Sequence, residues 1–327
     1  MGRTLEASVE RFATAAPFVI ARGAKHHVDV VTVTLRAGAQ LGRGEGTPIY
    51  YRGEDRETTL EAIRAATPTI EAGASRADLL DLMPACAARN AIDAALWDME
   101  AKETGRRVWQ MIGLPEPRPM LTAFTISLGD PADMERQARA AATRELLKLK
   151  LGGEGDADRV RAVRLAAPDA RLIADANQSW VGQDIEALCH QLHGYGVELV
   201  EQPLPAGEDA PLRDLRPAIP LAADESCHTR ADLDSIVGRY RYINVKLDKA
   251  GGLTEALALI HAARTRGLGV MVGCMLSTSL GVAPAFLAAM QAEYADLDGP
   301  LLLAADRVGG LEFSGSDVHP PQAALWG

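Results

Sequence analysis

The sequence predicts an α/β protein, built from a (β/α)8-type barrel and a smaller N-terminal α+β capping domain. Three observations indicate this fold. Beyond residue 120, short apolar runs that end in a polar residue recur, the segments between them have the period of amphipathic helices, and residues 1–115 lack this rhythm. Strands that alternate with helices at a steady period form a parallel sheet with right-handed crossovers, and seven or eight such units close most naturally into a barrel.

The predicted barrel strands are marked by the residues at which the apolar runs end. These markers are Lys150, Asp175, Glu201, Asp224, Lys246, Cys274 and Asp296. Successive markers are 25, 26, 23, 22, 28 and 22 residues apart, which is about the length that a strand, a helix and two short loops need. Amphipathic stretches such as "DADRVRAVRLAAP" and "LTEALALIHAARTRG" lie between them, and "LTAFTISLG" contains the expected first strand.

Residues 1–115 are expected to form the capping domain. "VDVVTVTLRAG" has the alternation of a strand that turns at a glycine, and "ETTLEAIRAATPTIEAG" and "AARNAIDAALWDMEAKETG" have the pattern of helices, the second ending at Gly105. The barrel is expected over residues 116–299. The segment from about 300 to 327 contains further short apolar stretches, and we expect it to return to the capping domain.

The composition argues against several classes of partner and location. The chain carries 34 Lys and Arg against 44 Asp and Glu, a net charge of -10, which disfavours nucleic acid or an anionic membrane as the main partner. Its four cysteines form no CxxC pair, so neither a disulfide framework nor a zinc site is indicated. No apolar run approaches the ~20 residues of a membrane span, and the N-terminus lacks a signal-peptide pattern. A cytoplasmic protein is expected, and a homo-oligomer stays open.

Two lysines in "ELLKLKLGG" raise a question about the strand that carries them. Lys148 and Lys150 point to one face of this strand, because side chains alternate along it. Taken alone, the stretch favours an exposed strand at the edge of a sheet, where charged side chains prevent pairing with strands of other molecules. In a barrel, however, the markers fall at the C-terminal ends of consecutive strands, where such folds assemble their active sites. The barrel context therefore favours a functional role for both lysines.

Three carboxylates on consecutive strands predict a metal site. Asp175, Glu201 and Asp224 should converge at one side of the barrel mouth, where they repel one another unless a cation lies among them. Oxygen ligands suit a hard octahedral ion, which favours Mg²⁺ over zinc. The alternatives are that the carboxylates pair with nearby lysines or cap the helices that follow the strands.

Lysines flank this carboxylate trio on both sides. Lys150 lies one strand before it and Lys246 one strand after it, so the two should face each other with the metal between them. A nearby cation and burial make a lysine a usable base, and the ion can stabilise the enediolate formed when a carbon next to a carboxylate loses its proton. Bases on opposite faces of one carbon indicate a racemase or epimerase, and Lys148 would give electrostatic support.

The motifs "KLK", "ADAN", "EQP", "ADES" and "NVKLDKAGG" resemble the muconate-lactonizing subgroup of the enolase superfamily, and most closely its dipeptide (L-Ala-D/L-Glu) epimerases. The resemblance spans nearly the whole chain and implies the modified (β/α)7β form of the barrel. It also implies one Mg²⁺ at Asp175, Glu201 and Asp224, and proton transfer by Lys150 and Lys246. A lysine base beside a Mg²⁺-stabilised enediolate is known for this superfamily.

The resemblance further implies residues that hold the substrate. Lys148 would lie beside the substrate carboxylate, and Asp296 and Asp298 would hold the free α-ammonium of a dipeptide. Two carboxylates that lie two residues apart on a strand share a face and suit a cation. Thr125 and Cys274 would contact the substrate backbone. Arg22 would bind the glutamate side-chain carboxylate, a task that suits a bidentate guanidinium.

Two departures from the family pattern affect the substrate side chain. "TPIYYRGED" (residues 47–55) and Leu280 differ from what close relatives carry, so specificity stays open. The favoured activity is epimerisation of L-Ala-D/L-Glu, which the family connects with breakdown of cell-wall peptides. A lyase such as o-succinylbenzoate synthase, an epimerase for another dipeptide and a barrel that only binds are the alternatives.

Overall fold

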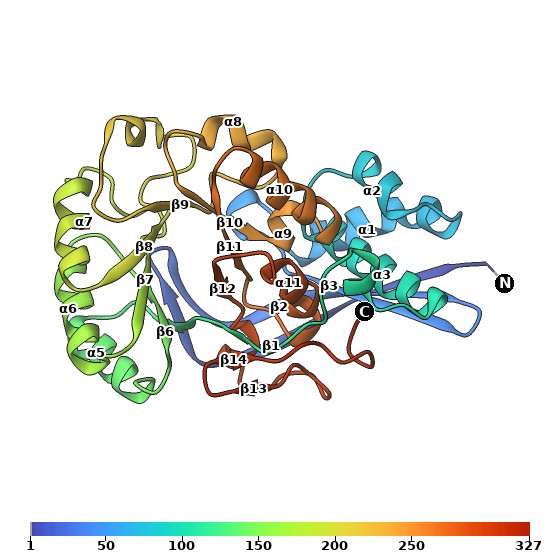
Figure 1. Ribbon diagram of the computed structural model, residues 1–327. Coiled ribbons are helices and arrows are strands. Elements are labelled where there is room, and N and C mark those ends of the chain that lie inside the picture. The colour runs from blue at the N-terminus through green and yellow to red at the C-terminus, as the bar shows by residue number, and fades with distance from the viewer. Residues whose placement is uncertain (1) are drawn as a thin grey trace.

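The computed structural model describes residues 2–327 and contains an eight-stranded parallel sheet that curves into a barrel (Figure 1). Neighbouring strands follow chain order, and β5 and β12 meet where Ala123 N donates to Ala295 O at 2.8 Å. The strands are β5 (Phe124–Ile126), β6 (Leu146–Lys150), β7 (Arg171–Asp175), β8 (Val197–Glu201), β9 (Leu221–Ala223), β10 (Tyr242–Lys246), β11 (Gly269–Gly273) and β12 (Tyr294–Asp296). The predicted barrel is therefore confirmed, with each marker residue at or just after the end of its strand.

Helices cover the outside of the barrel and connect its strands. They are α5 (Pro131–Ala140), α6 (Asp156–Ala166), α7 (Ile185–Gly194), α8 (Leu233–Ile236), the short α9 (Leu247–Ala250), α10 (Leu253–Thr265) and α11 (Ser279–Ala289). The β8–β9 connection departs from the predicted alternation, since it contains only the 3-10 turn η2 (Ala210–Asp214). Five prolines between residues 202 and 220 account for this, because proline interrupts the hydrogen bonding of a helix.

The alternation along β6 separates the hydrophobic core from the barrel interior. Leu147 and Leu149 point outward into the main hydrophobic core, whereas Lys148 and Lys150 are 1% and 7% exposed inside the barrel. This excludes the exposed edge strand that the stretch alone favours. A small apolar cluster below the lysines fills the barrel, and its buried members are Ala123, Leu146, Ile173, Leu199, Ala222 and Met271.

The capping domain consists of a three-stranded antiparallel sheet packed against helices. Its strands are β1 (Thr4–Ile20), β2 (Gly23–Ala37) and β3 (Gln40–Gly46), and its helical elements are η1 (Tyr50–Arg52), α1 (Arg56–Glu71), α2 (Arg76–Leu82), α3 (Ala87–Thr104) and α4 (Val108–Met111). Glycines on β3 let α3 approach the sheet: a Cβ on Gly44 would lie 2.1 Å from Ala91 O. This close approach fixes the orientation of α3, which contacts both domains.

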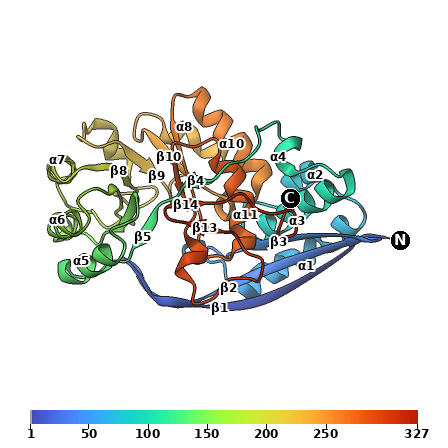
Figure 2. The same ribbon diagram turned by 60° about the horizontal axis from the view of Figure 1, so that its bottom comes forward.

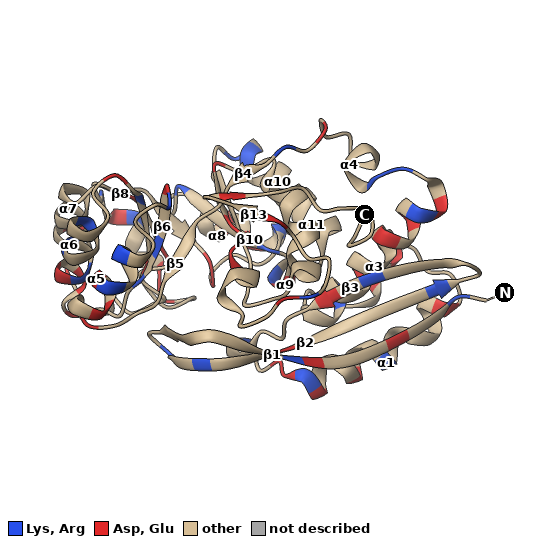
Figure 3. Ribbon diagram, turned by 90° about the horizontal axis from the view of Figure 1, so that it is seen from below, with Lys and Arg blue, Asp and Glu red and all other residues tan. Residues whose placement is uncertain are grey.

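The β1–β2 hairpin extends from the capping domain across to the barrel (Figures 1 and 2). Figure 3 shows its tip beside the barrel strands, far from the other end of the hairpin near the N-terminus. Leu128 N, just after β5, donates to Val19 O at 3.0 Å, so the tip is tied to the barrel by backbone hydrogen bonding. The hairpin therefore brings residues from the start of the chain to the barrel mouth.

The C-terminal segment contacts the barrel and then α3. β13 (Phe313–Ser314) and β14 (Asp317–Val318) form a small sheet with β4 (Met120–Leu121). Trp326 Nε1 then donates to Ala94 O at 2.9 Å, and Gly327 N donates to Asp98 Oδ1 at 2.8 Å. Among residues 2–327, none of the helices combines the length and hydropathy that a bilayer crossing needs.

A buried carboxyl group where the capping domain meets the barrel makes stability depend on pH. Asp248 on α9 accepts hydrogen bonds from Thr47 N (2.9 Å) and Asn90 Nδ2 (2.8 Å), and burial raises its pKa to about 7. The folded state thus binds this proton more tightly than the unfolded state, so the contribution of Asp248 to stability falls by up to about 4 kcal/mol as pH rises from about 4 to about 7.

We therefore expect Asp248→Asn, whose oxygen can still accept both hydrogen bonds, to gain stability relative to the original protein as pH rises. Thermal denaturation at pH 5 and pH 8 measures this difference. Asp158→Asn, at an exposed position on α6, is the matched control. Equal pH dependence in the original protein and in Asp248→Asn would contradict the assignment.

Candidate active site

Three buried carboxylates meet at the mouth of the barrel. Asp175 is the last residue of β7, Glu201 is the last of β8, and Asp224 follows β9 directly. Their exposed fractions are 0%, 1% and 3%, and one oxygen from each lies within 4.8 Å of the others. The structure therefore brings together the three residues that the sequence proposes as metal ligands. None of them forms the capping interaction of a following helix.

The three carboxylates differ in how well nearby lysines compensate their negative charges. Burial opposes ionisation of Asp175, but Lys150 and Lys148 outweigh it and lower its pKa to about 2. Burial and the charge of Asp175 raise the pKa of Glu201 to about 7. Glu201 is thus the carboxylate of the trio whose negative charge is least compensated, although its Oε2 lies 2.7 Å from Lys148 Nζ. Three buried carboxylates that converge in this way offer the oxygen donors that a hard divalent cation prefers.

Lys150 and Lys246 lie at opposite ends of the carboxylate row. Lys150 Nζ is 2.6 Å from Asp175 Oδ2, and Lys246 Nζ is 2.7 Å from Asp224 Oδ2. The two lysines come from β6 and β10, the strands on either side of the three that carry the carboxylates. Burial opposes the charge of Lys246, but Asp224 and Glu201 outweigh it and raise its pKa. A cation bound by the carboxylates would act in the opposite direction.

Lys148 links the carboxylate trio to the acidic residue at the end of β12. Its Nζ is 2.7 Å from Glu201 Oε2 and 2.7 Å from Asp296 Oδ2. Burial opposes its charge, but Asp296 and Glu201 outweigh it and hold the pKa of Lys148 well above its usual range. Lys148 is therefore a fixed positive charge at the centre of the site.

Asp296 and Asp298 are both buried, but they do not lie side by side on one strand as their spacing suggests. β12 ends at Asp296, and Asp298 precedes the 3-10 turn η4 (Gly299–Leu302). Asp298 Oδ2 accepts a hydrogen bond from Thr125 N at 2.6 Å, which ties β5 to this turn. Burial and the charge of Asp296 raise the pKa of Asp298 to about 7. The two carboxylates thus come from a strand end and from a turn.

A cavity of about 60 Å³ lies between the capping domain and the barrel mouth. The capping residues that line it are Phe18, Ile20, Arg22, Lys25, Tyr50 and Tyr51, and the barrel residues include Lys150, Asn177, Asp224, Glu225, Lys246 and Cys274. This volume holds only a few water molecules, so the cavity as it stands is too small for a dipeptide. A larger hollow of about 580 Å³ lies near Leu221 and Arg241, but its lining has no carboxylate or lysine.

Arg22 reaches the barrel from the tip of the hairpin. Its Nη2 is 2.7 Å from Glu225 Oε1, and its Nε donates to Tyr50 Oη at 2.9 Å. Glu225 is the neighbour of Asp224 and is buried, and its other carboxylate oxygen has no hydrogen-bond partner among residues 2–327. The Arg22–Glu225 ion pair therefore holds the hairpin down over the barrel mouth.

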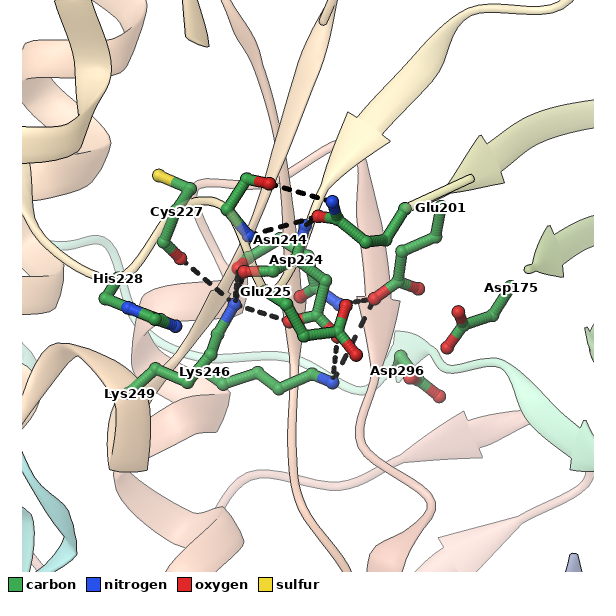
Figure 4. Close-up of polar contacts among 12 residues, drawn as sticks. Asp175, Glu201, Asp224, Glu225, Cys227, His228, Asn244, Lys246, Lys249 and Asp296 are labelled. Carbon is green, nitrogen blue, oxygen red and sulfur yellow. Dashed lines mark hydrogen bonds and ion pairs between the residues drawn. The ribbon is translucent and has the colours of Figure 1, made fainter. Parts of the chain in front are cut away.

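Several polar residues of the site carry no role in the sequence interpretation. Asn244 Nδ2 donates to Glu201 Oε1 at 2.6 Å, and Lys249 Nζ donates to Asp224 and to the carbonyl groups of Asn244 (2.9 Å) and Cys227 (3.1 Å) (Figure 4). Lys246 and Lys249 together hold the pKa of Asp224 well below its usual range, against the effect of burial.

Two sequence signals could have found these residues. Asn244 shares a strand face with Lys246, two residues away. The second signal is the choice of basic residue: only six of the 34 basic residues are lysines, and five of the six lie at the barrel mouth. Arginine fills the other basic positions, with Lys102 as the single exception.

The chain matches two family models that together cover most of its length. Residues 133–324 match the model described as "Enolase C-terminal domain-like", and residues 4–113 match the N-terminal domain of "Mandelate racemase / muconate lactonizing enzyme". L-Ala-D/L-Glu epimerase of Escherichia coli (strain K12) is 42% identical over 97% of this chain and 99% of its own. N-acetyl-D-glutamate racemase of Pseudoalteromonas sp is 40% identical over 91% of this chain and 95% of its own.

Solved structures agree with these matches. An enolase family member from Agrobacterium tumefaciens with homology to dipeptide epimerases, with bound sodium and L-Ala-L-Glu, has a TM-score of 0.97 and 48% identity over 99% of this chain and 100% of that one. A dipeptide epimerase from Enterococcus faecalis V583, complexed with Mg and L-Leu-L-Tyr, has a TM-score of 0.91 and 28% identity over 100% and 99%. The resemblance seen in the motifs is thus confirmed, and the chain belongs to the dipeptide epimerase family of the enolase superfamily.

Proposed function

We propose that this protein is a Mg²⁺-dependent dipeptide epimerase that inverts the α-carbon of the C-terminal residue of L-Ala-D/L-Glu. The observation that carries the proposal is the pair of lysines at opposite ends of a buried carboxylate row: Lys150 against Asp175, and Lys246 against Asp224. Two amines on either side of one substrate carbon provide an acid and a base for inversion. The names of the Escherichia coli relative and the Agrobacterium tumefaciens complex support the choice of dipeptide.

Asp175, Glu201 and Asp224 are proposed to hold the metal ion. Their converging oxygen donors suit Mg²⁺, and the Enterococcus faecalis structure is complexed with Mg. When bound, the ion supplies positive charge next to the substrate carboxylate and so favours loss of the neighbouring proton. Asn244 and Lys249 keep Glu201 and Asp224 oriented through their hydrogen bonds.

The proton transfer is proposed to run between the two lysines. For one stereoisomer, neutral Lys150 takes the α-proton, the electron pair of the C–H bond moves onto the substrate carboxylate, and the Lys246 ammonium gives a proton to the opposite face of the carbon. For the other stereoisomer the two lysines exchange these tasks. Lys148, buried with its charge maintained, stabilises the negative charge that develops on the carboxylate.

The remaining residues are proposed to select a dipeptide. Asp296 and Asp298, which are buried beside Lys148 and Thr125, would bind the α-ammonium of the N-terminal residue. Thr125 N donates to Asp298 and Cys274 N donates to the carbonyl oxygen of Asp296, and both residues would contact the peptide backbone. Arg22, at the hairpin tip, would bind the side-chain carboxylate of the C-terminal glutamate, in exchange for its present partner Glu225.

N-acetylglutamate is a second candidate substrate, because a racemase for it is 40% identical to this chain. It lacks an α-ammonium, so it offers no cation to the buried Asp298, which has no ion pair among residues 2–327, and Lys148 alone would compensate Asp296. The Asp296–Asp298 arrangement therefore favours a dipeptide over N-acetylglutamate. A lyase is less well supported, since its substrate gives these carboxylates no ammonium partner either.

Proton exchange with solvent tests the proposal. In D₂O with Mg²⁺, the enzyme is expected to replace the glutamate α-proton of L-Ala-L-Glu by deuterium and to produce L-Ala-D-Glu, both visible by proton NMR. N-acetyl-L-glutamate under the same conditions is the discriminating control. Exchange of N-acetyl-L-glutamate alone would replace the dipeptide assignment with the racemase, and exchange of neither compound would refute both.

A further inference from the structure

Lys25 is a cation of the capping domain that points into the active-site cavity. It stands opposite Phe18 in the β1–β2 hairpin, so both side chains lie on the same face of this ribbon. That face is turned toward the barrel, because both residues line the cavity together with Lys150 and Lys246. The Lys25 ammonium lies 4.1 Å from the centroid of the Tyr50 ring. It is therefore positioned by an aromatic face and not by an anion.

The charges around the cavity leave Lys25 without a counterion. Among the four cations that line the cavity, Arg22 pairs with Glu225, Lys150 with Asp175 and Lys246 with Asp224. Within residues 2–327, Lys25 has no carboxylate within the 4.0 Å of an ion pair. Burial, together with the positive charge of Arg22, Lys150 and Lys246, lowers its pKa to about 8. A bound anion would relieve this repulsion.

We infer that Lys25 is a specificity-determining residue, which receives the side-chain carboxylate of an acidic residue at the C-terminal position of the substrate. The inference rests on the proposed function, since it places the substrate α-carbon between Lys150 and Lys246. From that point the side chain extends toward the capping domain, where Lys25 and Arg22 are the two cations. Arg22 must give up Glu225 to bind this carboxylate, whereas Lys25 has no ion pair to break and can bind it directly beside Arg22.

The walls around Lys25 strengthen such an ion pair. Phe18 and Ile20 line the cavity on the hairpin side, and the Tyr50 ring lies beside the ammonium. Apolar walls exclude water and so increase the attraction between an ammonium and a carboxylate. A neutral side chain of the same shape gains nothing from this charge. The capping domain thus discriminates glutamate from glutamine at the C-terminal residue.

The test compares Lys25→Gln and Lys25→Arg on L-Ala-L-Glu and on the neutral isostere L-Ala-L-Gln, with Mg²⁺ present. Because a hydrogen bond to a charged group contributes ~1.5–3 kcal/mol, Lys25→Gln is expected to raise KM for L-Ala-L-Glu about 10-fold to 100-fold. Its kcat/KM for L-Ala-L-Gln should stay within about threefold of the original value. Lys25→Arg keeps the charge and should retain the preference for glutamate.

The outcomes separate this inference from the proposed function. If Lys25→Gln weakens both substrates equally, or weakens neither, Lys25 does not select the carboxylate, although the enzyme is still a dipeptide epimerase. If the unaltered protein epimerises no dipeptide, the proposed function fails and the inference fails with it. Thermal denaturation of both variants shows whether the hairpin fold is kept, and Lys25→Arg provides the comparison if Lys25→Gln is unstable.

Discussion

Lys150→Ala and Lys246→Ala are each expected to lower the rate of epimerisation by about a thousandfold or more. A positioned acid or base contributes roughly 10²–10⁴ in rate, and inversion needs one on each face of the α-carbon. Each lysine lies within 2.7 Å of a different carboxylate of the trio, at opposite ends of the row. Neither can therefore take over the task of the other. The loss is measured as the rate of formation of the opposite stereoisomer.

Isotope exchange gives the sharper result, because each variant keeps one of its two bases. Lys150→Ala keeps Lys246 and should still exchange the α-proton of the stereoisomer that Lys246 deprotonates. Lys246→Ala keeps Lys150 and should exchange the α-proton of the other stereoisomer. Lys102→Ala is the matched control, since Lys102 pairs with Asp98 in the capping domain and lies outside the site. Full activity in either catalytic variant, or the same exchange pattern in both, would contradict the two-base arrangement.

The barrel and the convergence of its ionisable residues could be predicted from the sequence for a simple geometrical reason. Parallel strands joined by helices all end at one rim, so residues at strand ends meet there whatever the details of the helices. Lys150, Asp175, Glu201 and Lys246 are each the last residue of their strand. The period of the chain thus predicts that these side chains lie near one another. It does not predict which of their atoms form ion pairs or hydrogen bonds.

Features that depend on turns and on contacts between domains could not be predicted in this way. β12 ends at Asp296, so Asp298 lies outside the strand. The spacing of two residues does not indicate where the hydrogen bonding between strands ends. The closure of the hairpin depends on Arg22 and Glu225, which are 203 positions apart. Lys249 follows its strand by a turn of helix, so strand alternation does not place it beside Asp224. Long-range packing determines the positions of these residues, so only the structure could reveal their contacts.

Glu201→Gln is expected to abolish both activity and stabilisation by Mg²⁺. Burial and the charge of Asp175 raise the pKa of Glu201 to about 7, so the ionised form of this carboxylate is disfavoured in the buried row. Removing that charge should leave the metal-free protein at least as stable as before, because repulsion is relieved. It should also weaken Mg²⁺ binding, because one charged ligand is lost. Stability and metal binding are therefore expected to change in opposite directions.

Thermal denaturation with and without Mg²⁺ measures both effects in the same variant. At a free Mg²⁺ concentration about 100 times its Kd, the original protein should gain about 2.7 kcal/mol, while Glu201→Gln should gain little. Glu198→Gln is the matched control, because Glu198 lies on the same strand but pairs with Arg171 on the partly exposed surface. If Glu201→Gln were strongly destabilised without metal, the carboxylate would be a structural partner of Lys148 and Asn244. If it kept the full Mg²⁺ stabilisation, the ion would be bound by other residues.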